Sequence, residues 1–238
     1  MYETTESDAP IYNRLLAALP AGEYRRLLPE LEQIALTYGE RIYEQGATIE
    51  YVYFPNSGII SLLAAAEEEA TLEVGIVGRE GIVGVAVFLG VETSNNNAIV
   101  QGQGFAMRMK ATAFLTECRQ SGMLPRLLRR FTQSLLAQIS QSAVCYRYHP
   151  AEDRLARWLL MTSDRMDTNE FHLTQDFLSN MLGVRREAVN KSAVILQQQQ
   201  LISYSRGNIL ITNRPELELK ACRCYAFIKD EEKSFPVH

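Results

Sequence analysis

The most chemically distinctive stretch of the sequence is SNMLGVRREAVNKSAVIL, residues 179–196. It places Arg185, Arg186, Glu187, Asn190 and Lys191 close together, and each of these side chains can hydrogen-bond to nucleic acid. An arginine pairs with guanine O6 and N7, a carboxylate accepts from cytosine N4, and an asparagine can pair with adenine. The stretch predicts base reading by Arg186, Glu187, Asn190 and Lys191, with double-stranded DNA as the partner.

In helical geometry, about 100° per residue, this stretch has one apolar and one polar face. Val189, Ala193 and Leu196 share the apolar face, whereas Glu187 and Lys191 point nearly opposite. A simpler interpretation is that Glu187 and Lys191 form an i, i+4 ion pair on a solvated face. The neighbouring elements decide between the two interpretations.

The elements on either side of this helix predict a winged helix-turn-helix. Thr174 is a suitable N-cap for a preceding helix, QDFLSNML, and Gly183 ends it. The second helix is expected from about residue 185 to 199, followed by two short strands, ISYS and ILIT, around Gly207. In such a domain the second helix enters the major groove. The expected phosphate contacts are Thr174, Gln175, Arg185, Arg206 and Asn208.

The charge distribution agrees with this placement. The chain of 238 residues carries −4 overall, with −5 in residues 1–146 and +1 in residues 147–238. With five Lys and Arg against two Asp and Glu, residues 174–214 carry +3. The electrostatic footprint for a nucleic acid is therefore confined to the last third.

The first half of the chain predicts a small antiparallel β-roll. Apolar alternation broken by glycines runs from QIALTYGERIYEQG to NAIVQGQGFAMRM, without the helical inserts of a parallel sheet. The expected fold class is α+β, with a roll at residues 1–121, a long helix at 122–149 and the winged helix-turn-helix at 150–238.

The long helix is expected to mediate dimerisation. Its apolar seam could pack against the roll or against the same helix of a second subunit. A second apolar strip, formed by Leu127, Leu136 and Val144, suggests that the helix touches both. The residues of the seam are Leu128, Phe131, Leu135, Ile139 and Tyr146.

At this point the sequence resembles the Crp/Fnr family of bacterial transcription regulators. The resemblance is carried by the run Gly183, Arg186, Glu187, Ala188, Val189 and Lys191, and it extends to YVYFPNSGIISLL and GIVGVAVFLG in the roll. It implies a homodimer on a pseudo-palindromic operator, with RNA polymerase as a further partner. Two positions depart from the family pattern, because Arg185 replaces the usual Ser or Thr cap and Lys191 replaces an arginine.

The resemblance also locates an effector pocket in the roll, at Gly81, Gly84, Val85, Asn96 and Asn97. In family members that bind cyclic nucleotides, a phosphate-binding segment called the cassette corresponds to GIVGVAVFLG here. A Glu follows the glycine of the cassette, and an Arg followed by Ser or Thr comes later. Val85 and the two asparagines cannot supply the charged fork that a buried phosphate requires. Cyclic nucleotide binding of the usual kind is therefore not expected, and the effector stays open. Arg79 or Arg108 could substitute, although both are more simply surface arginines.

Nothing in the sequence predicts a metal, a cofactor or an enzyme. Cys118, Cys145, Cys222 and Cys224 are scattered without a CxxC spacing, and an N-terminal cysteine group for an iron–sulfur cluster is missing. A haem on Cys118 or His149 would depend on a single residue. The polar start MYETTESDAP and the short apolar runs predict a cytoplasmic protein without a membrane segment.

Two other functions fit the same pattern. In one, the protein is a signalling module whose C-terminal domain docks a protein instead of DNA. In the other, it binds DNA constitutively and the roll is only a scaffold.

Overall fold

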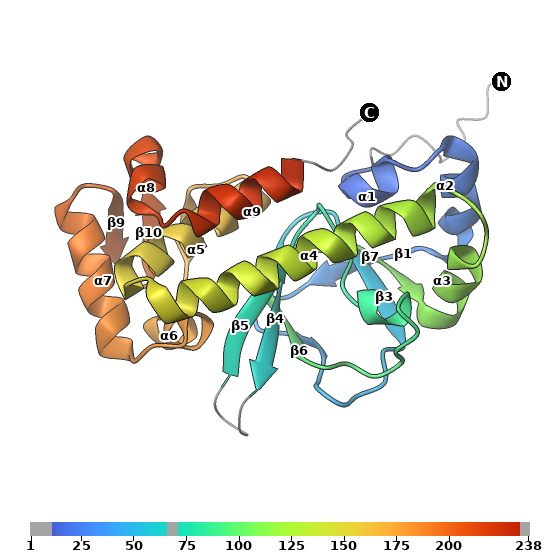
Figure 1. Cartoon of the computed structure of the whole chain (residues 1–238), viewed down its shortest axis with the longest axis horizontal. Coiled ribbons are helices and arrows are strands. Elements are labelled where there is room, and N and C mark those ends of the chain that lie inside the picture. Colours follow the sequence, from blue (N-terminus) through green and yellow to red (C-terminus); the bar gives the residue numbers. More distant parts are fainter. Residues whose placement is uncertain (1–10, 66–70, 234–238) are drawn as a thin grey trace.

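A computed structural model describes residues 11–65 and 71–233. Residues 1–10, which hold the segment MYETTESDAP, lie outside the described residues, as do residues 66–70 and 234–238. The described chain consists of a β-roll and a C-terminal helical domain, with the long helix α4 (Met123–Tyr148) running past both (Figure 1). This arrangement confirms the predicted α+β class.

The roll is built from two antiparallel sheets, with strand orders β1-β7-β3 and β2-β6-β4-β5. The segment GIVGVAVFLG, residues 81–90, lies outside the named strands of both sheets. This segment forms one isolated bridge, Tyr53 to Val83, and the short 3₁₀ helix η2 (Val85–Val87), because Gly84 turns the chain with φ 93°. The strands are β1 (Glu32–Leu36), β2 (Arg41–Tyr43), β3 (Tyr51–Pro55), β4 (Ile59–Ala65), β5 (Thr71–Val77), β6 (Asn97–Gly102) and β7 (Gly104–Lys110).

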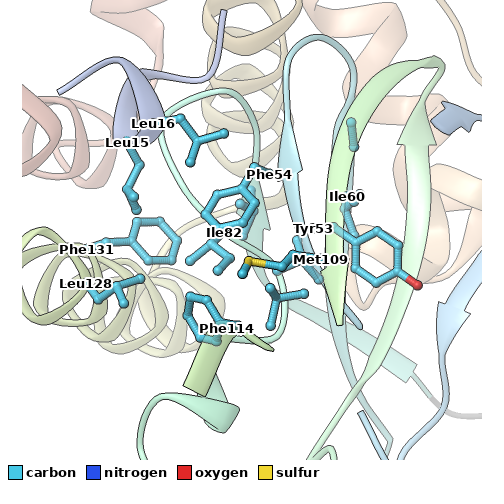
Figure 2. Close-up of a cluster of buried hydrophobic side chains, with 14 of the residues drawn as sticks. Leu15, Leu16, Tyr53, Phe54, Ile60, Ile82, Met109, Phe114, Leu128 and Phe131 are labelled. Atoms are coloured by element: carbon cyan, nitrogen blue, oxygen red, sulfur yellow. The ribbon is translucent and has the colours of Figure 1, made fainter. Parts of the chain in front are cut away.

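Short helices close the roll and complete its core (Figure 2). The buried Asn13 caps the first of these helices and also donates through Nδ2 to the carbonyls of Pro55 and Gly81, both at 2.9 Å. Leu128 and Phe131 of α4 enter the same core. The elements are α1 (Arg14–Ala17), α2 (Ala21–Leu27), η1 (Leu28–Glu30) and α3 (Ala111–Cys118).

The C-terminal domain contains the expected helix pair and more elements than the sequence predicts. The wing sheet has a third strand, in the order β8-β10-β9, and two further helices follow it. The elements are α5 (Ala151–Met166), β8 (Glu170–His172), α6 (Gln175–Leu182), α7 (Arg186–Gln198), β9 (Ile202–Ser205), β10 (Asn208–Ile211), α8 (Arg214–Lys220) and α9 (Cys224–Lys233).

The roll and the C-terminal domain share a hydrophobic cluster. Ile59, Leu63 and Ile76 of the roll pack with Trp158 of α5, which is 1 % exposed. The indole therefore lies on the buried side of α5. Burial of this kind, at roughly 25 cal/mol per Å² of apolar surface, holds the two parts together.

The seam of α4 faces the roll of its own chain. Leu128, Phe131 and Leu135 are at most 8 % exposed, Ile139 packs against the same core, and the Tyr146 hydroxyl donates to the carbonyl of Glu73. Leu128, Phe131 and Leu135 are thus buried within their own chain, whereas Ile139 and Tyr146 are only partly buried. A contact of this seam with a second subunit stays a prediction. Within the second predicted strip, Leu127 is also buried, whereas Leu136 and Val144 are exposed.

Candidate nucleic-acid interface

The helix pair α6 and α7 is organised by local interactions that the sequence predicts. The Thr174 Oγ1 accepts from the amide of Phe177 at 3.1 Å and so caps α6. Gly183 ends α6 in the left-handed region, with φ 57°. Arg185 is the N-cap residue of α7 and makes no side-chain cap hydrogen bond, which leaves its guanidinium at the start of the helix.

The two faces of α7 divide as expected. Val189, Ala193 and Leu196 are at most 1 % exposed and hold the helix in the domain. The polar face is open to solvent along its first two turns, and α7 lies at the outer end of the molecule, away from the roll (Figure 1). Its exposed side chains are Arg185, Arg186, Glu187, Asn190 and Lys191.

The ion pair that would explain Glu187 and Lys191 without DNA is missing. No salt bridge or hydrogen bond joins these two side chains to each other or to any other residue in the described part of the chain. Arg185 and Arg206 are likewise exposed and unpaired. These groups keep their hydrogen-bonding capacity for a ligand.

A groove of about 500 Å³ separates the start of α7 from the wing. It brings together five predicted residues, from α6, α7 and the wing turn, and so joins the candidate base-reading and phosphate-binding groups in one concave surface. Glu187, Lys191, Arg185 and Asn208 lie outside its lining. The five predicted residues in the groove are Thr174, Gln175, Arg186, Asn190 and Arg206.

Within this groove Gln175 links two of the candidate readers. Its Oε1 accepts from Arg186 Nε at 3.2 Å, and its Nε2 donates to Asn190 Oδ1 at 3.3 Å. Arg186 also pairs with Asp176 at 3.3 Å, with side chains 60 % and 71 % exposed. Because exposed pairs contribute only about 0–1 kcal/mol, exchanging them for contacts to DNA costs little.

The wing is a tight turn fixed by backbone conformation. Arg206 and Gly207 both have positive φ, 49° and 86°, and the side chain of Asn208 is held by His172 Nδ1 at 2.7 Å. This hydrogen bond comes from β8, a strand that the sequence pattern does not predict. Asn208 is therefore engaged within the wing, and its contact with phosphate stays a prediction.

The groove is also lined by residues outside the predicted DNA-contacting set. Val194 and Gln197 follow Asn190 at the helical spacing of four and three, which is the signal that could have found them. His172 and Tyr204 come from the wing strands, and their approach to α7 depends on long-range packing.

In the roll, the five predicted effector residues do not enclose a cavity among those we describe. A Cβ on Gly81 would lie 2.0 Å from the Phe131 ring, so the cassette is packed against α4. The Asn97 side chain accepts from the Gln45 amide at 2.9 Å, and Ser94 donates to the carbonyl of Asn96.

The side chain of Tyr43 packs beside the segment 81–90. Its hydroxyl contacts the backbone of Gly84 and the side chain of Ser94, and burial raises the Tyr43 pKa to about 12. Of the two arginines considered as substitutes for a phosphate ligand, Arg79 pairs with Asp167 at 2.5 Å and Arg108 with Glu32 at 2.8 Å. Both arginines are already neutralised by carboxylates.

A large cavity lies where the roll meets the C-terminal domain. This cavity of about 850 Å³ is lined by α1, the turn at Arg79 and Glu80, the end of α5, α8 and α9. Beneath it Arg165, 4 % exposed, bridges Glu80 of the roll and Glu232 of α9. The hollow is thus lined by charged groups, and it lies outside the predicted effector position.

The cysteines are scattered in the sequence but not in space. Cys145, Cys222 and Cys224 converge with His149. The distances along the sequence therefore do not separate these four side chains in space. Cys118 is half-buried and does not belong to the cluster.

Comparison with known proteins places both parts of the chain. Residues 33–121 match the sequence model of the cyclic nucleotide-binding domain, and residues 153–219 match that of the Crp-like helix-turn-helix domain. The chain is thus a regulator with a roll of the cyclic nucleotide-binding type and a Crp-like DNA-binding domain. It belongs to the Crp/Fnr family of transcription regulators.

Solved structures with the same fold cover most of the chain. FixK2 from Bradyrhizobium japonicum has 16 % identity and a TM-score of 0.69, over 81 % of this chain and 98 % of its own. The c-di-GMP responsive global regulator CLP from Xanthomonas campestris has 17 % identity and a TM-score of 0.67, over 82 % of this chain and 100 % of its own. TTHA1359, a CRP/FNR family regulator from Thermus thermophilus, has 21 % identity and a TM-score of 0.67, over 80 % of this chain and 98 % of its own.

No curated protein has a significantly similar sequence. Within residues 11–65 and 71–233, no helix is both long and apolar enough to cross a membrane.

Proposed function

We propose that the protein binds a specific DNA sequence through α7 and the wing. One observation carries this proposal: Glu187 and Lys191 are exposed and unpaired on the outward face of α7, while the opposite face is fully buried. An exposed arginine, carboxylate, asparagine and lysine at the start of a second helix suit the edges of bases in a major groove. Contacts to phosphate groups would fix the position of α7 along the DNA. The residues expected to make them are Thr174, Gln175, Arg185, Arg206 and Asn208.

The active form in this proposal is a homodimer. Because the seam of α4 packs mainly against its own chain, the exposed apolar residues Leu136 and Val144, 54 % and 45 % exposed, are the candidate contacts with a second α4. A two-fold axis at this strip would present two copies of α7 to successive major grooves, about 34 Å apart. The operator would then be a pseudo-palindrome.

The roll in this proposal senses an effector other than a cyclic nucleotide bound in the usual way. Support comes from the missing charged fork and from Tyr43, whose hydroxyl contacts the backbone of Gly84 and the side chain of Ser94. The protein would act in the cytoplasm with RNA polymerase as a partner and without enzymatic activity, in keeping with the regulators of the same fold.

The decisive experiment is selection of bound sequences from random duplex DNA with the purified full-length protein. We expect one enriched motif with two inverted half-sites about one helical turn apart. Binding should weaken steeply with salt, since released counterions dominate the affinity for DNA. No enrichment together with salt-independent binding would instead support a C-terminal domain that docks a protein.

The selected operator also tests whether the roll senses an effector or is only a scaffold. Cell extract and a panel of nucleotides can be added to the purified protein on its selected site. A change in operator affinity would support an effector, whereas an unchanged affinity would support constitutive binding.

A further inference from the structure

The end of α4 and the turn between α8 and α9 bring together four potential metal ligands. Cys145 and His149 are spaced i, i+4 at the end of α4, and Cys222 and Cys224 flank one residue in the turn. Their ligand atoms all lie within 4.8 Å of one another. The two sequence pairs are far apart along the chain, and α9 folding back along α4 brings them together (Figure 1).

We propose that Cys145, His149, Cys222 and Cys224 bind a single Zn²⁺ ion in a tetrahedral Cys₃His site. Three thiolates and one imidazole form one of the closed ligand sets of structural zinc. Soft sulfur ligands in tetrahedral geometry select zinc over magnesium or calcium, which prefer oxygen.

The distances within the cluster suit one ion. With Zn–S bonds of about 2.3 Å, tetrahedral geometry separates two sulfurs by about 3.8 Å. The Cys145 and Cys222 Sγ atoms lie 3.5 Å apart, and Cys224 Sγ lies 3.5 Å from His149 Nδ1. These separations are far longer than the roughly 2.05 Å of a disulfide bond. An iron–sulfur cluster places several iron and sulfide atoms between its cysteines and needs a wider cage.

The surroundings of the cluster contain buried positive charge whose hydrogen bonding is incomplete. Arg154 and Arg157 of α5 are 7 % and 2 % exposed, and the Nε atom of each has no hydrogen-bond partner. Both arginines interact electrostatically with Cys145 and Cys222. Neutral thiols would add no negative charge beside these two buried guanidinium groups, and buried charge is costly without a counter-charge. Zn²⁺ with three thiolates carries a net charge of −1 and supplies the missing anion.

The neighbouring polar groups also fit a loaded site. Gln141 of α4 donates through Nε2 to Cys224 Sγ at 3.1 Å, a contact that stabilises a thiolate and orients it. Cys145, Cys222 and Cys224 are buried, whereas His149 is half-buried and is the one ligand near solvent. This side offers an entry path for the ion.

The location gives the site a structural consequence that rests on the proposed function. Pro150 follows His149 directly and starts the bend from α4 into α5. A zinc ion here ties the last turn of α4 to the turn between α8 and α9. It would therefore fix how each DNA-binding domain is carried on α4.

The test is the metal content of the full-length protein, purified with a reductant and without a metal-affinity step. Elemental analysis should find about one Zn²⁺ per chain. Replacing the zinc by Co²⁺ should give the strong visible bands of a tetrahedral thiolate site. The double variant Cys145→Ser with Cys222→Ser should hold below about a tenth of the wild-type zinc. Cys118→Ser, which alters the cysteine outside the cluster, should keep all of it.

If the double variant fails to fold, alkylation of the wild-type protein tests the same site. Chelation should expose Cys145, Cys222 and Cys224 to iodoacetamide while leaving the labelling of Cys118 unchanged. The proposal is overturned by reduced protein without zinc, by iron and sulfide at the site, by a Cys145–Cys222 disulfide in place of metal, or by full zinc content in the double variant. None of these readouts involves DNA, so this proposal and the proposed function can fail separately.

Discussion

The indole Nε1 of Trp158 donates a hydrogen bond to Oε1 of Glu73 at 2.8 Å. Trp158 belongs to α5 and Glu73 to β5, and the two residues are only 1 % and 4 % exposed, so a buried carboxyl group links the C-terminal domain to the roll. The other oxygen, Oε2, lies 2.7 Å from Ser61 Oγ, which also lies 2.7 Å from Gln101 Oε1. The single hydroxyl proton of Ser61 cannot serve both oxygens. If Glu73 is protonated, its carboxyl group donates to Ser61 Oγ and the Ser61 hydroxyl donates to Gln101, so that each hydrogen bond has one proton.

This link predicts a dependence of stability on pH. Burial raises the pKa of Glu73 from 4.5 to about 7. Between these values the unfolded chain loses its proton and the folded chain keeps it, so the free energy of unfolding falls as pH rises through this window. The loss should approach about 3 kcal/mol and level off above pH 7.

Glu73→Gln should abolish this fall, because an amide cannot ionise. Urea unfolding measured at intervals from about pH 5 to 8 would show it as a flatter profile than that of the wild type. Glu92→Gln, at an exposed position of the roll, is the control and should follow the wild-type profile. Identical slopes for the wild type and Glu73→Gln would contradict a protonated Glu73.

Gly81 predicts a second effect on stability. A Cβ at this position would lie 2.0 Å from the Phe131 ring, which is 4 % exposed and cannot move freely. We expect Gly81→Ala to cost about 1–3 kcal/mol in thermal or urea unfolding. Adding Phe131→Leu should recover part of that loss.

Gly22→Ala is the matched control for Gly81→Ala. Its new Cβ would meet nothing within 4 Å, and the residue lies in α2. This change should be neutral or stabilise by roughly 0.5–1 kcal/mol. Equal effects of the two alanines would show that the cassette does not pack against α4 as described.

The parts of the fold that the sequence predicts are those specified by local patterns. The cap at Thr174, the left-handed Gly183 and the period of Val189, Ala193 and Leu196 define the helix pair within a short segment. The unpaired state of Glu187 and Lys191 could not be predicted, because an ion pair at this spacing is equally compatible with the sequence.

Other features depend on contacts between distant segments. The strand β8 has three residues and forms only because β10 pairs with it. The two faces of α4 are both partly apolar, so only the packed structure shows which one meets the roll. The helix α8 does have a local signal, since Asn213 caps it and Pro215 stands in its first turn. The cysteine cluster has none, because its two halves are 77 residues apart.

The exposed strip of α4 predicts the position of the dimer interface. Leu136→Glu and Val144→Glu should each weaken the dimer by about 100-fold, because the two-fold axis introduces two charges at once. Sedimentation velocity over a concentration series measures this change. Leu219→Glu, at a residue of α8 that is 79 % exposed, should leave the dimer intact. A wild-type protein that is monomeric at micromolar concentration would contradict the two-half-site arrangement.

The polar face of α7 predicts which side chains set the DNA sequence preference. Arg186→Ala should reduce affinity for the selected operator by about 1–3 kcal/mol and relax the preference at one base pair in each half-site. Arg185→Ala should instead weaken binding to all duplexes similarly and lower the salt slope, because a phosphate contact carries no base information. Fluorescence anisotropy on the operator and on a scrambled duplex separates the two outcomes.

Arg41→Ala is the matched control for Arg186→Ala. Both arginines form exposed ion pairs, Arg41 with Glu44 and Arg186 with Asp176, and their side chains are 63 % and 60 % exposed. Arg41 lies on the roll, so its removal changes the net charge equally without touching α7. If Arg41→Ala lowered operator affinity as much as Arg186→Ala, the loss would reflect overall charge and α7 would not be the reading helix.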